Sequence, residues 1–180
     1  MAKTIKVRNL RVENITPLDS PAVYWNRYPT TQEIENQVAK HRQEIEHIVS
    51  GDDDRMLMIV GPCSIHDTEA GLEYAERLRT LAEEVQDRIL IAMRVYFEKP
   101  RTTLGWKGFI NDPQLNGNED VSTGLAKARE FLLDVCGLGL ATATEWLEPF
   151  TPNTSVIWWR GELLALVLPN PNHTGWLQVD

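Results

Sequence analysis

Two uninterrupted apolar runs constrain the fold of this chain more than any other feature of its sequence. The first is MLMIVGPC at residues 56–63, which closes in Gly-Pro, and the second is ILIAMRVYF at residues 89–97. Strands buried on both faces have this pattern, whereas strands of a sheet with one wet face alternate apolar and polar residues. The two runs therefore predict strands of a parallel sheet that are buried on both faces.

The segments around these runs have the apolar period of amphipathic helices. Residues 67–86 form one such segment, and a second begins at Ser122, its expected N-cap, and stops at Gly137. A third strand candidate, LATATEW, follows at residues 140–146. Strand, helix, strand, helix and strand in this order predict an α/β fold with right-handed crossovers.

The first 51 residues lie outside this alternation. Three prolines interrupt residues 1–30, which we expect to form an extended arm. A helix is predicted next, because Thr30 and Glu33 have the spacing of a capping box and Gly51 suits a C-cap. The apolar residues of this helix fall on one face: Ile34, Val38, Ile45, Ile48 and Val49.

Charge and hydropathy argue against several classes of function. The chain has 26 Asp and Glu against 18 Lys and Arg, a net charge of −8, which disfavours binding to nucleic acid or to an anionic membrane surface. No apolar run approaches the roughly 18–20 residues that span a bilayer, and the first residues lack the apolar region of a secretory signal. Two cysteines cannot build a disulfide framework. We expect a cytoplasmic protein.

Chemistry in parallel α/β folds lies at the carboxyl ends of the strands. Cys63 directly follows the first run. A small buried hydrophobe is the commoner role of a single cysteine, and a thiolate metal ligand or nucleophile is the alternative that this position favours. The chain has no CxxC pair, which argues against a structural zinc site. His66 is open to three interpretations, as a second ligand, a capping group or a plain loop residue.

A cationic cluster accompanies the second run. Arg94 lies inside it, and Lys99, Arg101 and Thr102 follow. A buried cation needs an anionic partner, and these side chains are the ones that hold carboxylate and phosphate groups. In an acidic chain the cluster predicts a pocket for a small, highly charged anion. The alternative is a network of ion pairs within the chain, in which Glu145, at the end of the third strand, would be a partner of Arg94.

The same segments resemble the class I 3-deoxy-7-phosphoheptulonate (DAHP) synthases of the phenylalanine-, tyrosine- or tryptophan-sensitive type, which begin the shikimate pathway. The resemblance rests on LMIVGPCSIHDTEAGLEYAERL, MRVYFEKPRTTLGWKGFINDP, GLAKAREFLL and LATATEWLEPFTP, and it is close over residues 25–153. It implies a TIM (β/α)8 barrel with an N-terminal helical extension. It also implies a homo-oligomer, and an aromatic amino acid as a possible effector.

The resemblance also implies a reaction and the residues that serve it. Phosphoenolpyruvate condenses with erythrose 4-phosphate, and phosphate is released. By motif, Arg94 and Lys99 resemble the catalytic pair that binds phosphoenolpyruvate, Arg101 and Thr102 the contacts to erythrose 4-phosphate, and Glu145 a glutamate of the pocket. A sibling synthase that uses a different sugar phosphate is a looser match to the KPRTT and GWKG motifs.

A divalent metal ion of the manganese, iron, cobalt or zinc type is the cofactor that the resemblance implies. Cys63 resembles the family's metal-ligand cysteine. The metal would polarise the aldehyde as a Lewis acid, so that C3 of phosphoenolpyruvate can attack it.

The resemblance stops at Pro152, where the family would continue with a strand and a GARTTESQ motif. A frame offset by two bases can encode that motif, so we hypothesise that residues 153–180 are a frameshift product, which the gene sequence would test. The expected units are an N-terminal extension at 1–51, the first part of a barrel at 52–152, truncated after about the third strand, and the tail at 153–180. Three of eight strands cannot close a barrel. We therefore predict an inactive fragment. The alternative is a non-catalytic fragment that binds anions or another subunit.

Overall fold

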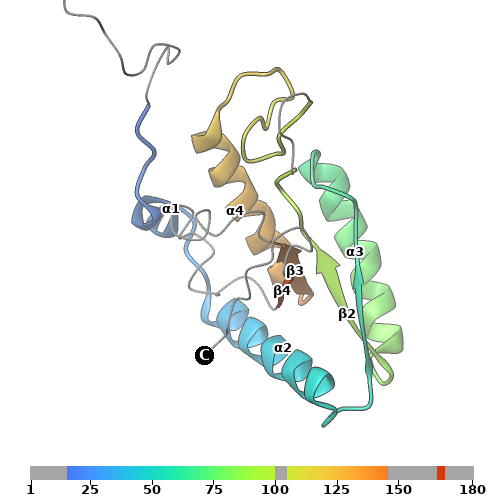
Figure 1. The fold of residues 1–180 in the computed structure, drawn as a ribbon. Helices are drawn as coiled ribbons and strands as arrows, with labels where there is room; N and C mark the ends of the chain where they lie inside the picture. Colours follow the sequence, from blue (N-terminus) through green and yellow to red (C-terminus); the bar gives the residue numbers. More distant parts are fainter. Residues whose placement is uncertain (1–15, 100–104, 146–165, 169–180) are drawn as a thin grey trace, which may run out of the picture.

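The computed structural model describes residues 16–99, 105–145 and 166–168, which form an α/β fold with one parallel sheet (Figure 1). This confirms the fold class that the apolar runs predict. The helices and strands, in chain order, are α1 (Pro21–Arg27), α2 (Gln32–Ser50), β1 (Met56–Val60), α3 (Thr68–Val85), β2 (Ile89–Arg94), α4 (Val121–Gly137), β3 (Ala141–Glu145) and β4 (Leu166–Leu168). No helix within these ranges is long and apolar enough to cross a membrane.

The strands lie side by side in the order β1-β2-β3-β4, and every pair is parallel. The register pairs Met58 with Ile91 and Ala92 with Ala141. β4 is a fourth, three-residue strand beside β3, and it comes from the segment 153–180 that lies beyond the family pattern. The sequence predicted three strands and no regular element there. The frameshift origin of that segment stays a prediction.

Helices cover both faces of the sheet, and the alternation of side chains along β2 shows how. Ile91 and Met93 point to the face on which α3 and α4 pack, where they join the larger apolar core. Leu90 and Ala92 point to the opposite face, where Ile45 of α2 packs on them. β2 is therefore buried on both faces, as its sequence predicts.

β1 departs from the prediction that it is buried on both faces. Met56 and Met58 are 60% and 37% exposed. The reason is position: β1 is an edge strand of the described sheet, with a neighbour on one side only. An apolar sequence allows a strand to be buried on both faces, but the elements packed on the strand decide how much of it is covered.

Helix starts also differ from the sequence prediction. Thr31, one residue after the expected cap, accepts a hydrogen bond from the backbone N–H of Ile34 at 3.3 Å, while the Thr30 hydroxyl donates to the Glu35 carboxylate. Asp120, not Ser122, caps α4. Val49, expected on the buried face of α2, is 74% exposed.

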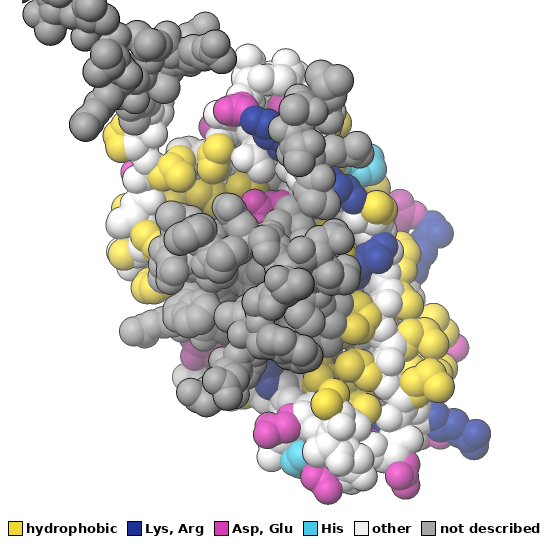
Figure 2. Space-filling view, viewed as in Figure 1, with side chains coloured by type: hydrophobic (Ala, Val, Ile, Leu, Met, Phe, Trp, Pro, Cys, Tyr) yellow, Lys and Arg dark blue, Asp and Glu magenta, His cyan; other side chains and the backbone are white. Residues whose placement is uncertain are grey.

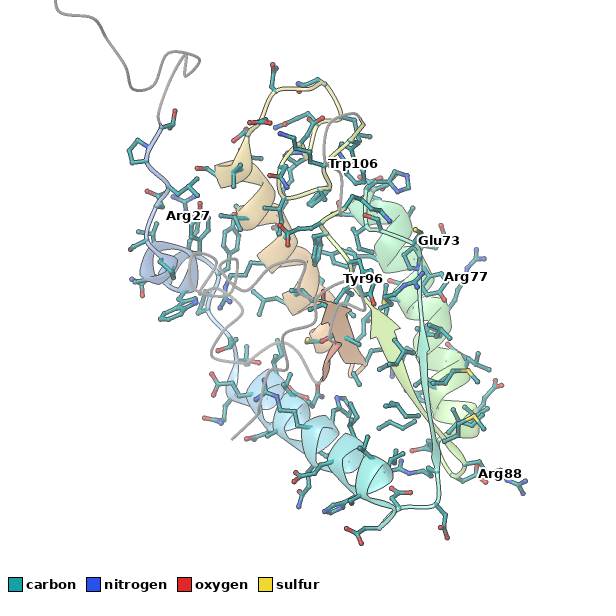
Figure 3. All side chains as sticks on the ribbon, in the orientation of Figure 1. Arg27, Glu73, Arg77, Arg88, Tyr96 and Trp106 are labelled. Carbon is teal, nitrogen blue, oxygen red and sulfur yellow. The ribbon has the colours of Figure 1, made fainter. Side chains whose placement is uncertain are left out.

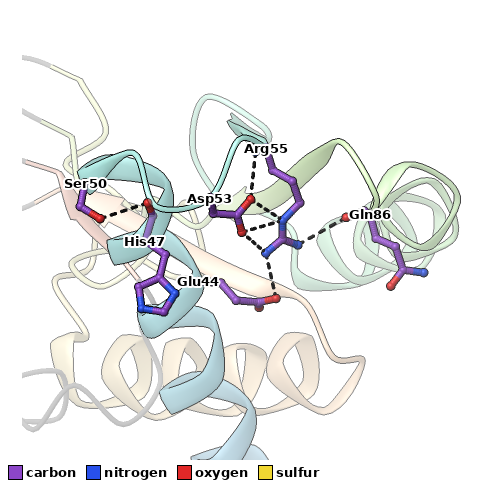
Figure 4. Close-up of polar contacts among 6 residues, drawn as sticks. All are labelled: Glu44, His47, Ser50, Asp53, Arg55 and Gln86. Atoms are coloured by element: carbon purple, nitrogen blue, oxygen red, sulfur yellow. Dashed lines mark hydrogen bonds and ion pairs between the residues drawn. The ribbon is translucent and has the colours of Figure 1, made fainter.

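A polar clasp fixes the start of β1 to the rest of the fold (Figure 4). Arg55 forms ion pairs with Asp53 and with Glu44 of α2, and its guanidinium also donates to the backbone carbonyl of Gln86 at the end of α3. The hydrogen bonds that Arg55 donates to the Asp53 carboxylate lower the pKa of that carboxyl and raise the pKa of Arg55. The clasp lies at the amino end of β1, opposite the predicted site.

Candidate anion site at the strand ends

The turn Gly61-Pro62-Cys63, at the carboxyl end of β1, is the centre of the candidate site. It lies directly against β2. A Cβ atom on Gly61 would stand 2.6 Å from the backbone oxygen of Arg94 and 2.9 Å from its Cβ. Because no side chain fits in that space, glycine is what allows the turn to approach the end of β2.

Arg94, the last residue of β2, binds this turn through its side chain. Its Nε donates to the carbonyl of Pro62 at 3.0 Å, and its Nη2 donates to the carbonyl of Gly61 at 2.9 Å. The guanidinium carbon also lies 5.2 Å from the centre of the Tyr96 ring, a cation–π contact. Tyr96 follows the end of β2 in Figure 3. The guanidinium is therefore held in one orientation at the strand ends.

Lys99 also reaches the same turn. Its Nζ lies 2.9 Å from the carbonyl oxygen of Cys63 and 2.9 Å from its Sγ. The Cys63 side chain is exposed. A thiolate is the form of cysteine that binds metals, and a neighbouring ammonium stabilises it. Arg94 and Lys99 thus both bind the turn at residues 61–63, which also carries the Cys63 sulfur.

Backbone pairing with residues 107 and 108 holds Lys99 in place. The backbone N–H of Lys99 donates to the carbonyl of Lys107 at 3.0 Å, and Glu98 forms an antiparallel bridge with Gly108. Gly108 has φ +112°, and a Cβ there would lie 2.3 Å from the backbone oxygen of Phe97. Only glycine suits both that backbone conformation and that contact.

The loop after Gly108 is organised by a residue that the sequence patterns did not indicate. Asp112 is 9% exposed, and its carboxylate accepts the backbone N–H groups of Asn116 and Gly117. Its backbone carbonyl accepts the indole N–H of Trp106, labelled in Figure 3, at 2.8 Å. The Asn-Asp-Pro sequence at this point is a turn signal that could have found it.

The partners of Arg94 and Lys99 differ from those of the described cations that form ion pairs. Each described arginine with an ion pair has a carboxylate partner, and the Lys107 ammonium pairs with Glu119. Within the described ranges, Arg94 and Lys99 donate to carbonyls and to sulfur and form no ion pair with a carboxylate. There they leave positive charge uncompensated at the strand ends, as an anion site requires.

Three predicted site residues cannot be placed in this geometry. Arg101 and Thr102 lie outside the described residues. The backbone of Glu145 pairs with Leu168, but its side chain is outside the description. His66 is exposed, in the turn before α3, where Asp67 rather than His66 accepts the first helical N–H groups.

The described residues do not make a complete metal site. No group of three or more His, Cys, Asp or Glu side chains with ligand spacing occurs in the described part of the chain. Cys63 would supply one ligand, whereas metals of the zinc type take at least three protein ligands in catalytic sites. The other cysteine, Cys136, is buried in α4, and burial raises the pKa of its thiol to about 12. Cys136 is therefore a core residue.

Comparisons with known proteins agree on one family. A family model described as the DAHP synthetase I family matches residues 30–156. A phospho-2-dehydro-3-deoxyheptonate aldolase of Amycolatopsis methanolica is 50% identical over 144 residues, which cover 80% of this chain and 71% of that protein. The Trp-sensitive enzyme of that name from Escherichia coli K12 is 48% identical over 151 residues, which cover 84% of this chain and 42% of the relative.

A solved structure supports the same relationship. The phospho-2-dehydro-3-deoxyheptonate aldolase of Francisella tularensis SCHU S4 superposes with a TM-score of 0.78 at 43% sequence identity. The superposition covers 85% of this chain and 43% of that one. The chain thus spans about two fifths of the length of the Escherichia and Francisella proteins.

Proposed function

The chain belongs to the DAHP synthetase I family, and from this premise we propose that its site serves the DAHP synthase reaction by binding phosphoenolpyruvate. In that reaction C3 of phosphoenolpyruvate attacks the aldehyde carbon of erythrose 4-phosphate, water adds at C2, and inorganic phosphate leaves. The names of the relatives support the reaction. One observation carries the assignment: Arg94 and Lys99 both donate to the single turn at residues 61–63.

The two cations suit the charge of this substrate. Phosphoenolpyruvate carries a carboxylate and a phosphate on adjacent atoms of a three-carbon unit. The Arg94 guanidinium is planar and offers paired donors, whereas the Lys99 ammonium is a compact point charge. We assign to both the binding and orientation of the substrate, and to Lys99 also the stabilisation of negative charge on the departing phosphate.

We propose further that the chain does not turn over both substrates by itself. It spans 42% of the length of the Trp-sensitive relative, and the described residues contain one binding turn and one candidate ligand. The alternative function, a non-catalytic module that binds anions, predicts the same binding without turnover. The names of two Escherichia coli relatives, Trp-sensitive and Phe-sensitive, support an aromatic amino acid as effector. We also propose that the protein is a homo-oligomer in the cytoplasm.

Calorimetric titration with phosphoenolpyruvate tests the assignment. We expect Lys99→Met to weaken binding at least tenfold, about 1.4 kcal/mol. Lys107→Met is the matched control, because the Lys107 ammonium is exposed and already paired with Glu119. Equal binding by the wild type and Lys99→Met would refute the site. A parallel assay with erythrose 4-phosphate and Mn²⁺ should show no product, and robust metal-dependent turnover would refute the proposed inactivity.

A further inference from the structure

The loop between β2 and α4 contains the dipeptide Asn116-Gly117, and both of its residues are exposed. The loop is drawn in yellow at the top of Figure 1, and in Figure 2 the same end of the molecule is mostly backbone and uncharged side chains, with acidic side chains beside them. The side-chain amide carbon of an asparagine is an electrophile. The backbone nitrogen of the next residue is a nucleophile that closes a five-membered ring on it, so the two reacting groups are already neighbours in the chain.

The nucleophile of this pair lies against a carboxylate. The backbone N–H of Gly117 donates to Oδ2 of Asp112 at 3.0 Å, within the range of about 2.6–3.2 Å at which a side chain acts as a general base. Asp112 is 9% exposed, and its Oδ1 accepts the backbone N–H of Asn116 at 3.1 Å. The carboxylate is therefore fixed beside the proton that the Gly117 nitrogen has to lose.

The electrophile of the pair is polarised by a second contact. The side-chain oxygen Oδ1 of Asn116 accepts the backbone N–H of Asn118 at 2.8 Å. Attack on the amide carbon places negative charge on this oxygen, and a donor about 2.7–3.1 Å away stabilises such charge. The N–H of Asn118 is therefore placed as an oxyanion donor for ring closure.

The glycine leaves the attacking nitrogen accessible. A Cβ atom at Gly117 would meet no atom within 4 Å, so the peptide stands in open space. Its φ of +78° lies in the left-handed region that favours glycine. Ring closure changes the backbone angles of this peptide, and an exposed glycine adopts new angles at low cost.

We propose that Asn116-Gly117 is a self-modification site, at which the folded loop promotes formation of a cyclic imide. The bond from the Gly117 nitrogen to Cγ of Asn116 forms, and the bond from Cγ to Nδ2 breaks. The proton of the Gly117 N–H passes to the Asp112 carboxylate and from there to the departing nitrogen, which leaves as ammonia. Water then opens the imide at either carbonyl, which gives aspartate or isoaspartate at position 116. The inference goes beyond the proposed function, because it concerns the chain itself and not a substrate.

The two other asparagines of this loop lack the arrangement. The N–H that follows Asn111 belongs to Asp112, and it donates to a backbone carbonyl and not to a carboxylate. Asn118 is followed by Glu119, whose side chain adds bulk beside the attacking nitrogen. We therefore expect Asn116 to react first in the folded protein.

Peptide mass spectrometry of the 180-residue chain, incubated at about pH 7.5 and 37 °C, tests the proposal. We expect a gain of about 1 Da at Asn116, at a rate at least threefold higher in the folded chain than in the chain denatured by guanidinium chloride. Asp112→Asn keeps an acceptor oxygen but removes the carboxylate. This substitution should lower the rate in the folded chain at least fivefold and leave the rate in the denatured chain unchanged. The substituted side chain precedes Pro113, which has no N–H, so it adds no second site of this kind.

Glu119→Gln is the matched control, because Glu119 is an exposed carboxylate of the same loop that pairs with Lys107. Its rate should stay within about twofold of the wild type. Circular dichroism verifies that both variants fold, and if Asp112→Asn does not, the comparison of folded and denatured wild type decides alone.

A rate in the folded chain at or below that in the denatured chain would overturn the inference, since the bond to Asp112 would then protect the Gly117 nitrogen. Equal rates for wild type and folded Asp112→Asn, or a faster reaction at Asn111 or Asn118, would also overturn it. None of these readouts depends on phosphoenolpyruvate, so the inference and the proposed function fail separately.

Discussion

Gly61→Ala should loosen the turn on which the site is built. The added Cβ would lie 2.6 Å from the backbone oxygen of Arg94, whereas ordinary van der Waals contact begins at 3.4 Å. The turn and the end of β2 would therefore have to separate by about 0.8 Å. Both groups are backbone, so a side-chain rotation cannot relieve the contact.

The magnitude follows from that displacement. Overpacking at a close backbone contact costs roughly 1–3 kcal/mol. A shift of this size would also lengthen the bonds from Arg94 to the carbonyls of Gly61 and Pro62 from 2.9 and 3.0 Å beyond hydrogen-bond range. Since Arg94 is half-buried, the loss of both bonds adds about 1 kcal/mol. We expect a total loss of about 2–4 kcal/mol in the free energy of unfolding.

Urea denaturation followed by circular dichroism measures this loss. With a slope of about 2 kcal/mol per molar urea, the midpoint should fall by about 1–2 M. Gly137→Ala is the matched control, because nothing lies within 4 Å of a Cβ at that helical position, and alanine there should be neutral or stabilising by up to about 1 kcal/mol. A midpoint for Gly61→Ala within about 0.2 M of the wild type, or equal losses for the two variants, would refute the close-approach argument.

Three other predictions concern the rest of the chain. In the native protein, iodoacetamide should label exposed Cys63 quickly and buried Cys136 only after unfolding; mass spectrometry of the labelled peptides checks this, and equal rates would contradict the structure. Thr31→Ala should lower the free energy of unfolding by about 1 kcal/mol, and Thr30→Ala by less, because Thr31 caps α2; the reverse order in urea melts would favour the capping box. Burial lowers the pKa of His41 below its usual 6.5. The unfolded chain therefore takes up the proton more readily, and the free energy of unfolding should fall as the pH drops below about 6.5. His41→Gln should reduce that dependence in melts from pH 7.5 to 5, and an unchanged pH profile would contradict the prediction.

Local sequence patterns predicted the order of the elements from α2 to β3, because apolar period and run length are local signals. The expected extended arm at residues 1–30 was wrong for Pro21–Arg27, which form helix α1. The patterns failed where contacts between distant parts of the chain determine the end of a strand or the exposure of a side chain. In the run at residues 89–97, the regular strand ends at Arg94. Val95 still donates to Ala143 of β3, and the chain from Phe97 onward pairs with residues 107–110. Exposure of Met56 could not be predicted, because it depends on which strand lies beside β1. Thr30 and Thr31 both suit a cap, and the backbone conformation selects one.

The candidate site was predictable in part. Cys63 comes at the end of one apolar run, and Arg94 lies within the other. These positions indicated that the chemistry lies at the strand ends. The contact between Lys99 and Cys63 joins residues 36 positions apart, and no spacing rule predicts it. Tyr96 carries no sequence signal that sets it apart from other residues of an apolar run, although its ring helps to orient Arg94.

A crystal structure of the 180-residue chain grown with phosphoenolpyruvate is the most direct test of the central claim, that Arg94 and Lys99 form an anion site on the turn at residues 61–63. We expect the ligand's phosphate or carboxylate oxygens within about 3 Å of Lys99 Nζ and of the Arg94 guanidinium. Phosphoenolpyruvate bound elsewhere, or both cations paired with carboxylates of the chain itself, would contradict it.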